Sequence, residues 1–225
     1  MRTVDDPLLW SAEVEFAHAK LLEDPRNNSA WSQRWFARHE GRDAGTPALA
    51  PTRATVLPLA VAREEVRYAL SGAGVDPHNE SPWRYLLGVV LEQVRWARRE
   101  GDAEEATARR DLLRDAIART RDLRRSLEEG TAGEDGVPPA AAVAAVPCVS
   151  LTSALVDLLE ALADDDDGDG GLAEAEGLCA ELARADPVRR KYWRRRGREA
   201  AARREERRRK GEGAVAKTEE EEAAP

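Results

Sequence analysis

The chain has few of the residues on which β-sheets, disulfide frameworks and membrane spans depend. Aromatic residues make up only 5% of it, it has two cysteines, and strand-typical runs of Val, Ile, Thr and Tyr are missing. No apolar run approaches the roughly 18 residues of a membrane span. Ala, Arg, Glu and Leu dominate instead, and this composition favours an all-α protein. We therefore expect no stable membrane insertion.

The first residues and the cysteines favour a cytoplasmic location. Residues 1–6 are polar and acidic, unlike the start of a signal peptide. Cys148 and Cys179 have no metal-ligand spacing, and we expect both to be reduced thiols. The three histidines are scattered and form neither a catalytic triad nor a metal set with the cysteines.

The net charge of −8 conceals a segregation of charge along the chain. Residues 1–188 have a net charge of −14, residues 189–210 a net charge of +10, and residues 211–225 a net charge of −4. An acidic body repels nucleic acid, whereas the basic segment by itself resembles a nucleic-acid or nuclear-import patch. Because the segment has few interleaved aromatic residues and its glutamates can pair with its arginines, we expect a solvated helix and no nucleic-acid partner.

One short pattern recurs three times. The segment 24–31, Asp-Pro-Arg-Asn-Asn-Ser-Ala-Trp, returns 52 residues later as Asp-Pro-His-Asn-Glu-Ser-Pro-Trp at 76–83. The segment 186–193 keeps Asp, Pro and Trp at the same spacing. Proline disfavours helical geometry in the residue before it, so Asp-Pro ends one helix, and the polar residues that follow can cap the next. The sequence therefore predicts a repeat protein of antiparallel helical hairpins.

The hydrophobic periodicity places helices on both sides of each turn. We expect them at 8–23, 29–40, 58–74, 81–99, 102–128 (as one long or two short helices), 150–163, 172–185 and 188–210. In the first helix, Leu9, Phe16, Leu21 and Leu22 form the predicted buried stripe. The helical-repeat domain then covers 1–210, with insertions at 41–57 and 129–147 and an acidic loop at 164–171, and 211–225 is a disordered acidic tail.

The residues that recur around the turns are the candidate structural sites. Ser29 and Ser81 are predicted helix N-caps, the second with Pro82 at the first helical position. The tryptophans are expected to fill the space between hairpins, with direct partner contact as the alternative. Arg34 and Arg196 lie one turn after a tryptophan and could pair with a carboxylate of the next repeat, pair with a partner, or remain solvated. The repeat set comprises Asn27, Ser29, Trp31, Arg34, Asn79, Ser81, Trp83, Tyr192, Trp193 and Arg196.

The acidic loop also fits a metal-binding pattern. Asp165, Asp167, Asp169 and Glu176 match the spacing of an EF-hand calcium loop. Asp165, Asp166 and Asp169 also fit the spacing that isoprenoid synthases use for magnesium diphosphate. EF-hands usually occur in pairs and a low-complexity Asp/Gly run matches such patterns by chance, so we expect no metal site here.

The longer spellings of the repeats resemble the protein prenyltransferase alpha-subunit family. The segment 23–36 resembles the family's R-N-N-S-x-W-x-Q-R-[FYW]-F string, and 77–88 resembles P-H-N-E-S-x-W-x-Y-L-x-G. The segment 186–196 resembles D-x-[IV]-R-x-x-Y-W-x-x-R. The resemblance covers about 8–40, 58–99 and 150–200. It favours the subunit shared by farnesyltransferase and type I geranylgeranyltransferase over the Rab geranylgeranyltransferase alpha subunit.

The resemblance implies a right-handed alpha-alpha superhelix that forms a heterodimer with a beta subunit. The complex transfers a farnesyl or geranylgeranyl group from its diphosphate to the cysteine of a C-terminal CaaX motif. Zinc belongs to the beta subunit and magnesium to the holoenzyme, so no cofactor is expected in this chain. The family's lysine- and tyrosine-bearing repeats have no counterpart here, so we assign no catalytic residue and expect the chain to match the C-terminal half of such a subunit. A non-catalytic interaction scaffold is the alternative.

Overall fold

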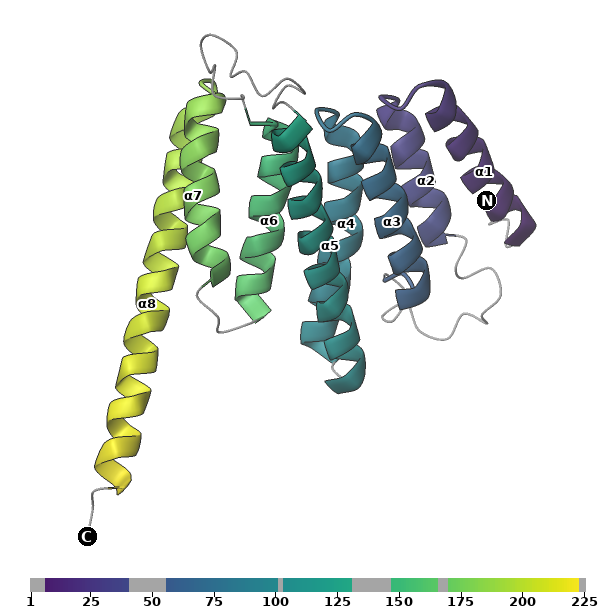
Figure 1. Ribbon diagram of the computed structural model, residues 1–225. Coiled ribbons are helices and arrows are strands. Elements are labelled where there is room, and N and C mark those ends of the chain that lie inside the picture. Colours follow the sequence, from purple (N-terminus) through teal and green to yellow (C-terminus); the bar gives the residue numbers. More distant parts are fainter. Residues whose placement is uncertain (1–6, 41–55, 101–102, 131–146, 166–169, 223–225) are drawn as a thin grey trace. The chain divides into compact units, whose positions relative to one another are not determined.

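A computed structural model describes residues 7–40, 56–100, 103–130, 147–165 and 170–222, with side chains except at 7, 100, 130, 165, 170 and 211–222. Within these residues all regular structure is helical, which confirms the all-α class (Figure 1). The helices are α1 (Pro7–Glu23), α2 (Asn28–Glu40), α3 (Leu59–Val75), α4 (Glu80–Glu100), α5 (Ala103–Gly130), α6 (Val149–Asp165), α7 (Gly170–Ala185) and α8 (Arg190–Glu222).

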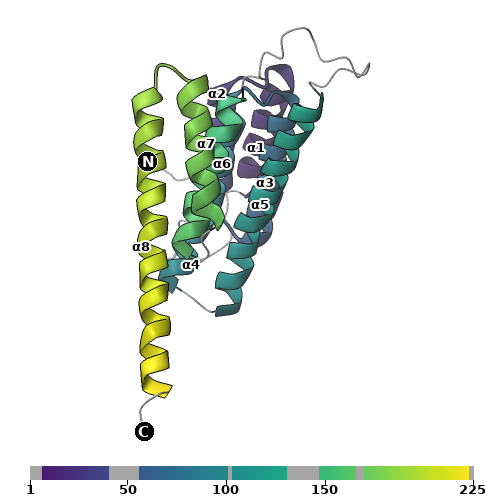
Figure 2. The ribbon, with the colours of Figure 1, turned by 60° about the vertical axis from the view of Figure 1, so that its left-hand side comes forward.

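The chain forms two compact units, Met1–Leu123 and Arg124–Pro225, each of which has its own core. In the first unit α1 packs antiparallel on α2, and α3 on α4, and α2 also contacts α4 (Figures 1 and 2). These contacts make two helical hairpins that lie side by side. The buried residues of α4 recur at helical spacing, and Trp83, Leu86, Val90 and Val94 are all at most 2% exposed.

The second unit contains three successive antiparallel helices, α6, α7 and α8 (Figure 2). The stripe of α6 is fully buried at Leu151, Leu155, Leu158 and Leu159. Small residues let the helices approach closely, and Ala163 of α6, Leu172 of α7 and Ala200 of α8 form one buried cluster. This unit is therefore an α-helical layer held by leucine and alanine.

Several helix boundaries differ from those that the sequence predicts. The segment 102–128 forms one helix, α5, which extends through 129–130 into the predicted insertion. At the end of the other insertion Leu57 is fully buried, and residues 41–55 and 131–146 lie outside the described residues. Helix α8 continues to Glu222, well beyond 210, because Ala, Lys and Glu are strong helix formers. The helical segment 211–222 replaces most of the predicted disordered tail.

The predicted buried stripe of α1 was mostly wrong. The structure buries Val14, Ala17 and Leu21, whereas Leu9 and Phe16 are 46% and 57% exposed. The buried face of α1 is thus built of Val14, Ala17 and Leu21, while Trp10 on the same helix meets Phe36 of α2 edge to face. Periodicity alone marks both faces of this helix as apolar, and it does not show which one is covered.

Candidate interaction site at the repeated turns

In all three turns the aspartate side chain accepts a hydrogen bond from a backbone N–H two or three residues later. Asp24 Oδ1 accepts a hydrogen bond from Arg26 N at 2.9 Å, and Asp76 Oδ1 accepts one from His78 N at 3.2 Å. In the third turn Asp186 Oδ1 accepts from Arg189 N at 3.1 Å. Each aspartate therefore folds the chain back after the helix has ended, which is the usual role of this side chain in a turn.

The helix caps are asparagines, so the predicted serine caps were wrong. Helix α2 begins at Asn28, and Asn27 Oδ1 accepts from Ala30 N at 3.1 Å. Helix α4 begins at Glu80, and Asn79 Oδ1 accepts from Ser81 N at 3.1 Å. Asparagine caps as well as serine does, and the earlier helix start places each serine at the second helical position. Ser81 and Pro82 consequently lie two positions further into the helix than predicted.

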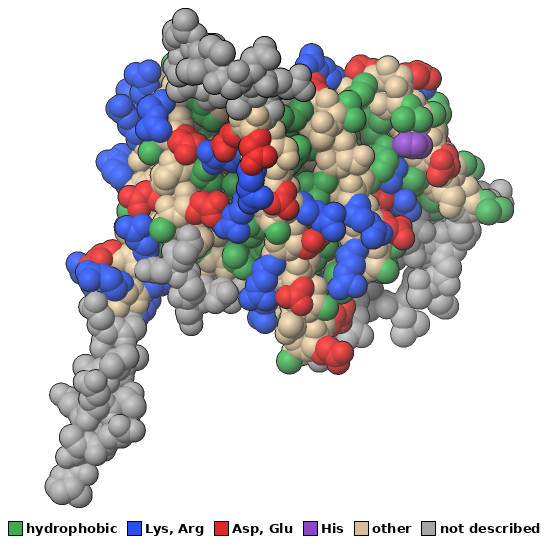
Figure 3. All heavy atoms as spheres, in the orientation of Figure 1, with side chains coloured by type: hydrophobic (Ala, Val, Ile, Leu, Met, Phe, Trp, Pro, Cys, Tyr) green, Lys and Arg blue, Asp and Glu red, His purple; other side chains and the backbone are tan. Residues whose placement is uncertain are grey.

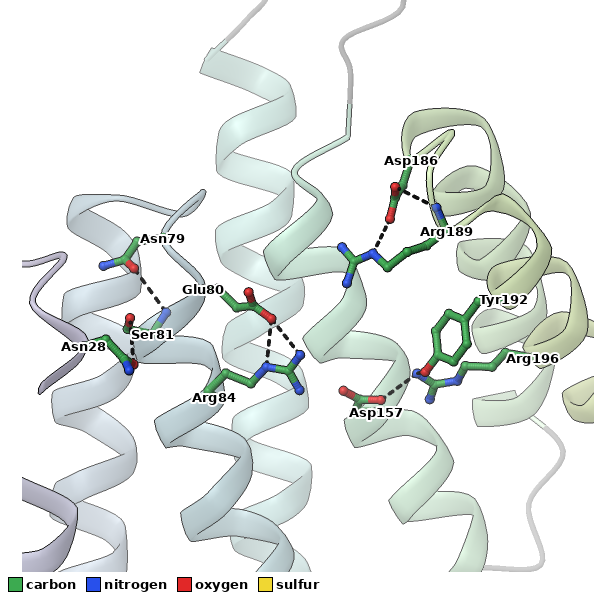
Figure 4. Close-up of polar contacts among 10 residues, drawn as sticks. All are labelled: Asn28, Asn79, Glu80, Ser81, Arg84, Asp157, Asp186, Arg189, Tyr192 and Arg196. Carbon is green, nitrogen blue, oxygen red and sulfur yellow. Dashed lines mark hydrogen bonds and ion pairs between the residues drawn. The ribbon is translucent and has the colours of Figure 1, made fainter. Parts of the chain in front are cut away.

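The first two turns are tied directly to each other. Pro25 O accepts Trp31 Nε1 from its own hairpin at 3.1 Å and Asn79 Nδ2 from the next hairpin at 2.8 Å. Ser81 Oγ lies 3.3 Å from Asn28 Oδ1, and the close-up shows this contact between the two helix starts (Figure 4). We call these contacts, together with the one described next, the turn ladder. The ladder fixes the register of one hairpin on the other.

An exposed ion pair completes the turn ladder. Arg26 Nε lies 2.7 Å from Asp76 Oδ2. The hydrogen bond from Arg26 holds the pKa of the Asp76 carboxyl below its ordinary value, and the pairing raises the pKa of the Arg26 guanidinium. Because the arginine is largely exposed, water screens the pair, and its role is mainly to align the turns.

The three repeat tryptophans are buried beside their turns. Trp31, Trp83 and Trp193 are 4%, 1% and 1% exposed. Trp83 Nε1 donates to Pro77 O at 2.8 Å, in the same way as Trp31 to Pro25, whereas Trp193 Nε1 donates to Asp186 Oδ2 at 3.0 Å. The indoles thus join the turn to the core, and no described tryptophan of this set is available for direct contact with a partner.

Arg34 lies in a buried charge network between the first two hairpins. Its Nε and Nη2 atoms donate to the two carboxylate oxygens of Glu65 at 2.7 and 2.8 Å. Tyr85 Oη donates to Glu65 Oε2 at 2.6 Å, and Arg38 approaches Glu65 Oε1 at 2.6 Å. Burial, followed by the adjacent Glu65 charge, raises the pKa of Tyr85. Of the alternatives for Arg34, the structure shows pairing with the next repeat.

Glu65 and Tyr85 are structural residues that sequence reasoning missed. Glu65 is fully buried, and Tyr68 on the same helix stacks on the Arg34 guanidinium at 3.5 Å. The only sequence signal is that Glu65 lies at helical spacing between the buried positions Ala62 and Ala69. That signal is weak because a glutamate on a helix is usually solvated.

Arg196 makes the equivalent contact in the second unit. It donates from Nε to Glu160 Oε1 at 3.2 Å and lies 2.8 Å from Asp157 Oδ1, so it ties α8 to α6. Its Nη1 also lies 3.2 Å from Tyr192 Oη, and Figure 4 shows Tyr192 and Asp157 converging on the guanidinium. Arg196 is 9% exposed. These contacts show pairing with a neighbouring helix rather than with solvent.

The acidic loop lies largely outside the described residues. Asp167 and Asp169 are not described, and Asp165 ends α6. Glu176, the last residue of the EF-hand pattern, lies within α7 and forms an ion pair with Arg204 Nη1 at 3.0 Å. Among the side chains that the structure describes, no group of three or more His, Cys, Asp or Glu residues is placed to hold a metal ion.

The hairpins and the turn ladder define an α-helical repeat protein. The model of the family described as "Protein prenyltransferase alpha subunit repeat" matches residues 10–39, which span α1, the first turn and most of α2. The first hairpin of the chain is therefore similar to this repeat.

Curated relatives point to the same family. The chain is 27% identical over 187 residues to "Protein farnesyltransferase/geranylgeranyltransferase type-1 subunit alpha" of Arabidopsis thaliana, covering 82% of this chain and 47% of the relative. The similarly named proteins of Dictyostelium discoideum and Pisum sativum are 31% and 34% identical over 84 and 86 residues, which cover 37% of this chain and 23% and 22% of the relatives. The chain therefore spans less than half the length of each of these curated relatives.

No described helix has both the length and the apolarity that a membrane span requires.

Proposed function

We propose that the chain acts as the helical-repeat scaffold of a protein prenyltransferase alpha subunit of the farnesyltransferase/geranylgeranyltransferase type-1 kind. The observation that carries the proposal is the repeated capped turn, the first copy of which lies within the family match. In this proposal the chain pairs with a beta subunit, and the complex transfers a prenyl group from its diphosphate to a C-terminal cysteine thiolate.

The proposed role of this chain is positioning. The turn ladder and the Arg34–Glu65 pair hold neighbouring hairpins in one register, so the edge formed by the turns is a rigid surface. A rigid support is needed because catalysis by a partner's site depends on geometry to within fractions of an ångström. Zinc on the beta subunit would stabilise the thiolate of the protein substrate, with magnesium acting at the level of the holoenzyme. The described residues of this chain provide no ligand set for either ion.

Co-expression with a beta subunit tests the proposal. The 225-residue chain is produced with the beta subunit of farnesyltransferase, of type I geranylgeranyltransferase, or of the Rab-directed enzyme, and each pair is purified through the beta subunit. Recovery of the chain with one of the first two, but not with the third, supports the proposed class. Trp83→Ala is a matched control, because it removes a buried indole and should abolish co-purification.

Transfer activity separates catalysis from scaffolding. Purified complexes are supplied with a fluorescent CaaX peptide and either farnesyl or geranylgeranyl diphosphate, with a Cys→Ser peptide as the blank. Thiol-dependent transfer supports the full proposal. A stable complex without transfer supports the alternative, a non-catalytic interaction scaffold, and a folded chain that ignores all three beta subunits contradicts both the proposed partner and the proposed class.

A further inference from the structure

The turn between α7 and α8 carries basic side chains around an exposed apolar residue. Val188, at the turn, is 94% exposed, and Tyr192, one helical turn further on, is 40% exposed. Arg184, Arg190, Lys191 and Arg194 are all exposed beside them. We call these six residues the basic tip. Figure 3 shows Lys and Arg side chains gathered where α8 begins.

The basic residues of α8 divide into an inward and an outward set. The inward arginines are neutralised by neighbouring helices: Arg196 pairs with Asp157 and Glu160, and Arg204 pairs with Glu176. By contrast, within the described side chains Arg190, Lys191 and Arg194 have no carboxylate partner. Their positive charge is therefore available to an external anion.

The helical spacing places the outward set on one face. Arg190, Arg194 and Arg198 are separated by four residues each, so they lie one above the other along the helix. Arg198 Nε contacts only a backbone oxygen, that of Arg194, at 3.3 Å. Glu199, on the same helix, lies 3.5 Å from Arg195. The face therefore keeps most of its positive charge.

We propose that the basic tip docks on the surface of an anionic lipid bilayer. The basic side chains bind lipid phosphates, and Val188 and Tyr192 enter the headgroup region. Apolar and aromatic side chains surrounded by Lys and Arg are the combination that partitions into a membrane interface without crossing it. The contact is peripheral, and it is independent of whether the chain binds a beta subunit.

The same features favour lipid over other polyanions. A nucleic acid would neutralise the basic charges but would leave Val188, the most exposed large hydrophobic residue of the molecule's described part, without an apolar partner. The tip is also convex, because it is the end of a helical hairpin, and a bilayer surface can accommodate a convex shape. Charge complementarity and the protruding apolar residue together identify the anionic lipid surface.

Vesicle flotation with the full chain tests the proposal. The chain is mixed with vesicles of phosphatidylcholine alone or with about one third phosphatidylserine, a composition that gives a negative surface potential. We expect binding only to the anionic vesicles, falling steeply as salt is added. Equal binding to neutral vesicles, or no binding at low salt, would overturn the proposal.

Two variants separate the charge from the apolar contact. Each Lys or Arg near an anionic surface contributes a factor of about five in binding, so the triple reversal Arg190→Glu/Lys191→Glu/Arg194→Glu should weaken partitioning by about 100-fold or more. Val188→Ser should weaken it several-fold without changing the net charge. The matched control Arg63→Glu/Arg67→Glu/Arg99→Glu replaces three exposed arginines of the first unit and should bind much more tightly than the tip variant.

A duplex DNA of random sequence serves as the competing ligand. Binding to DNA that exceeds binding to anionic vesicles, and that Val188→Ser leaves unchanged, would show that the tip is a nucleic-acid site and would overturn the lipid proposal. All replaced residues are exposed, and circular dichroism of each variant confirms that its helix content is retained. If the triple variant fails to fold, Val188→Ser and the salt series still decide the outcome.

Discussion

Arg34 and Glu65 form a two-pronged ion pair in the core of the first unit, with the arginine 5% exposed and the glutamate fully buried. The arginine belongs to α2 and the glutamate to α3, so the pair joins two successive hairpins. A planar guanidinium matches a carboxylate at both oxygens, which a lysine ammonium cannot do. The pair therefore specifies how one repeat packs on the next.

Removal of Arg34 should strongly destabilise the first unit. Arg34→Met leaves a buried carboxylate with only the partly exposed Arg38 and the Tyr85 hydroxyl as partners, and loss of one member of a buried pair costs about 3–5 kcal/mol. Urea unfolding measures this loss. Arg38→Met, at the more exposed guanidinium, should cost clearly less.

The double variant Arg34→Met/Glu65→Leu is the decisive control. It removes both charges, so it should be more stable than Arg34→Met alone, although it leaves Tyr85 without its acceptor. Equal destabilisation by Arg34→Met and Arg38→Met would contradict the importance assigned to the buried pair.

Two glycines of α3 should respond to alanine in opposite directions. A Cβ at Gly72 would lie 2.9 Å from Trp31 Cη2, whereas nothing lies within 4 Å of a Cβ at Gly74. Trp31 is buried and cannot move aside without disturbing the turn, so Gly72→Ala should cost about 1–3 kcal/mol from overpacking. Gly74→Ala should be neutral or stabilise by up to about 1 kcal/mol, because alanine favours the helix. Thermal unfolding of both variants distinguishes these outcomes, and a harmless Gly72→Ala would contradict the close contact.

Asparagine rather than serine should control the start of α4. Asn79→Ala removes both the cap on Ser81 N and the hydrogen bond to Pro25 O, and we expect a loss of about 1–2 kcal/mol. Ser81→Ala removes only an exposed side-chain contact with Asn28 and should cost less than about 0.5 kcal/mol. Chemical denaturation of the two variants is the measurement. A larger loss of stability in Ser81→Ala than in Asn79→Ala would instead identify Ser81 as the cap.

The sequence was sufficient for the local features of the fold. Asp-Pro turns, the helical class and the repeat spacing depend on short-range chemistry, so they can be predicted from residues 24–31 and 76–83 alone. The position of the cap was wrong by two residues because asparagine and serine are equally good caps and both occur there. Two equally good cap residues within three positions leave the first residue of each helix undetermined by the sequence.

Long-range pairing could not be predicted from the sequence. Glu65 is one of two adjacent glutamates on α3, and its burial depends on Arg34, which lies 31 residues earlier on another hairpin. The covered face of α1 could not be predicted either, since Phe16 has the larger apolar surface and yet Val14 and Ala17 are buried. Both features depend on which helix lies opposite, and the sequence pattern does not contain that information.

Cys179 should be chemically protected and should make the stability of the second unit depend on pH. The thiol is 1% exposed, and burial raises its pKa to about 11, with the Arg196 guanidinium opposing the shift. A native-state labelling experiment with an iodoacetamide probe at neutral pH should modify Cys148 and leave Cys179 unmodified, because the reactive form is the thiolate.

The sign of the pH dependence follows from the raised pKa of Cys179. In the unfolded chain the thiol ionises near its ordinary pKa of about 8.5, whereas in the folded chain it stays neutral until about pH 11. Its contribution is therefore fully present below about pH 8.5 and is lost as the pH rises towards 11, by about 3 kcal/mol in total. Urea unfolding between these pH values measures the loss, and Cys179→Ala should flatten this part of the profile despite its lower stability at neutral pH. An unchanged slope in Cys179→Ala would assign the pH dependence to other groups.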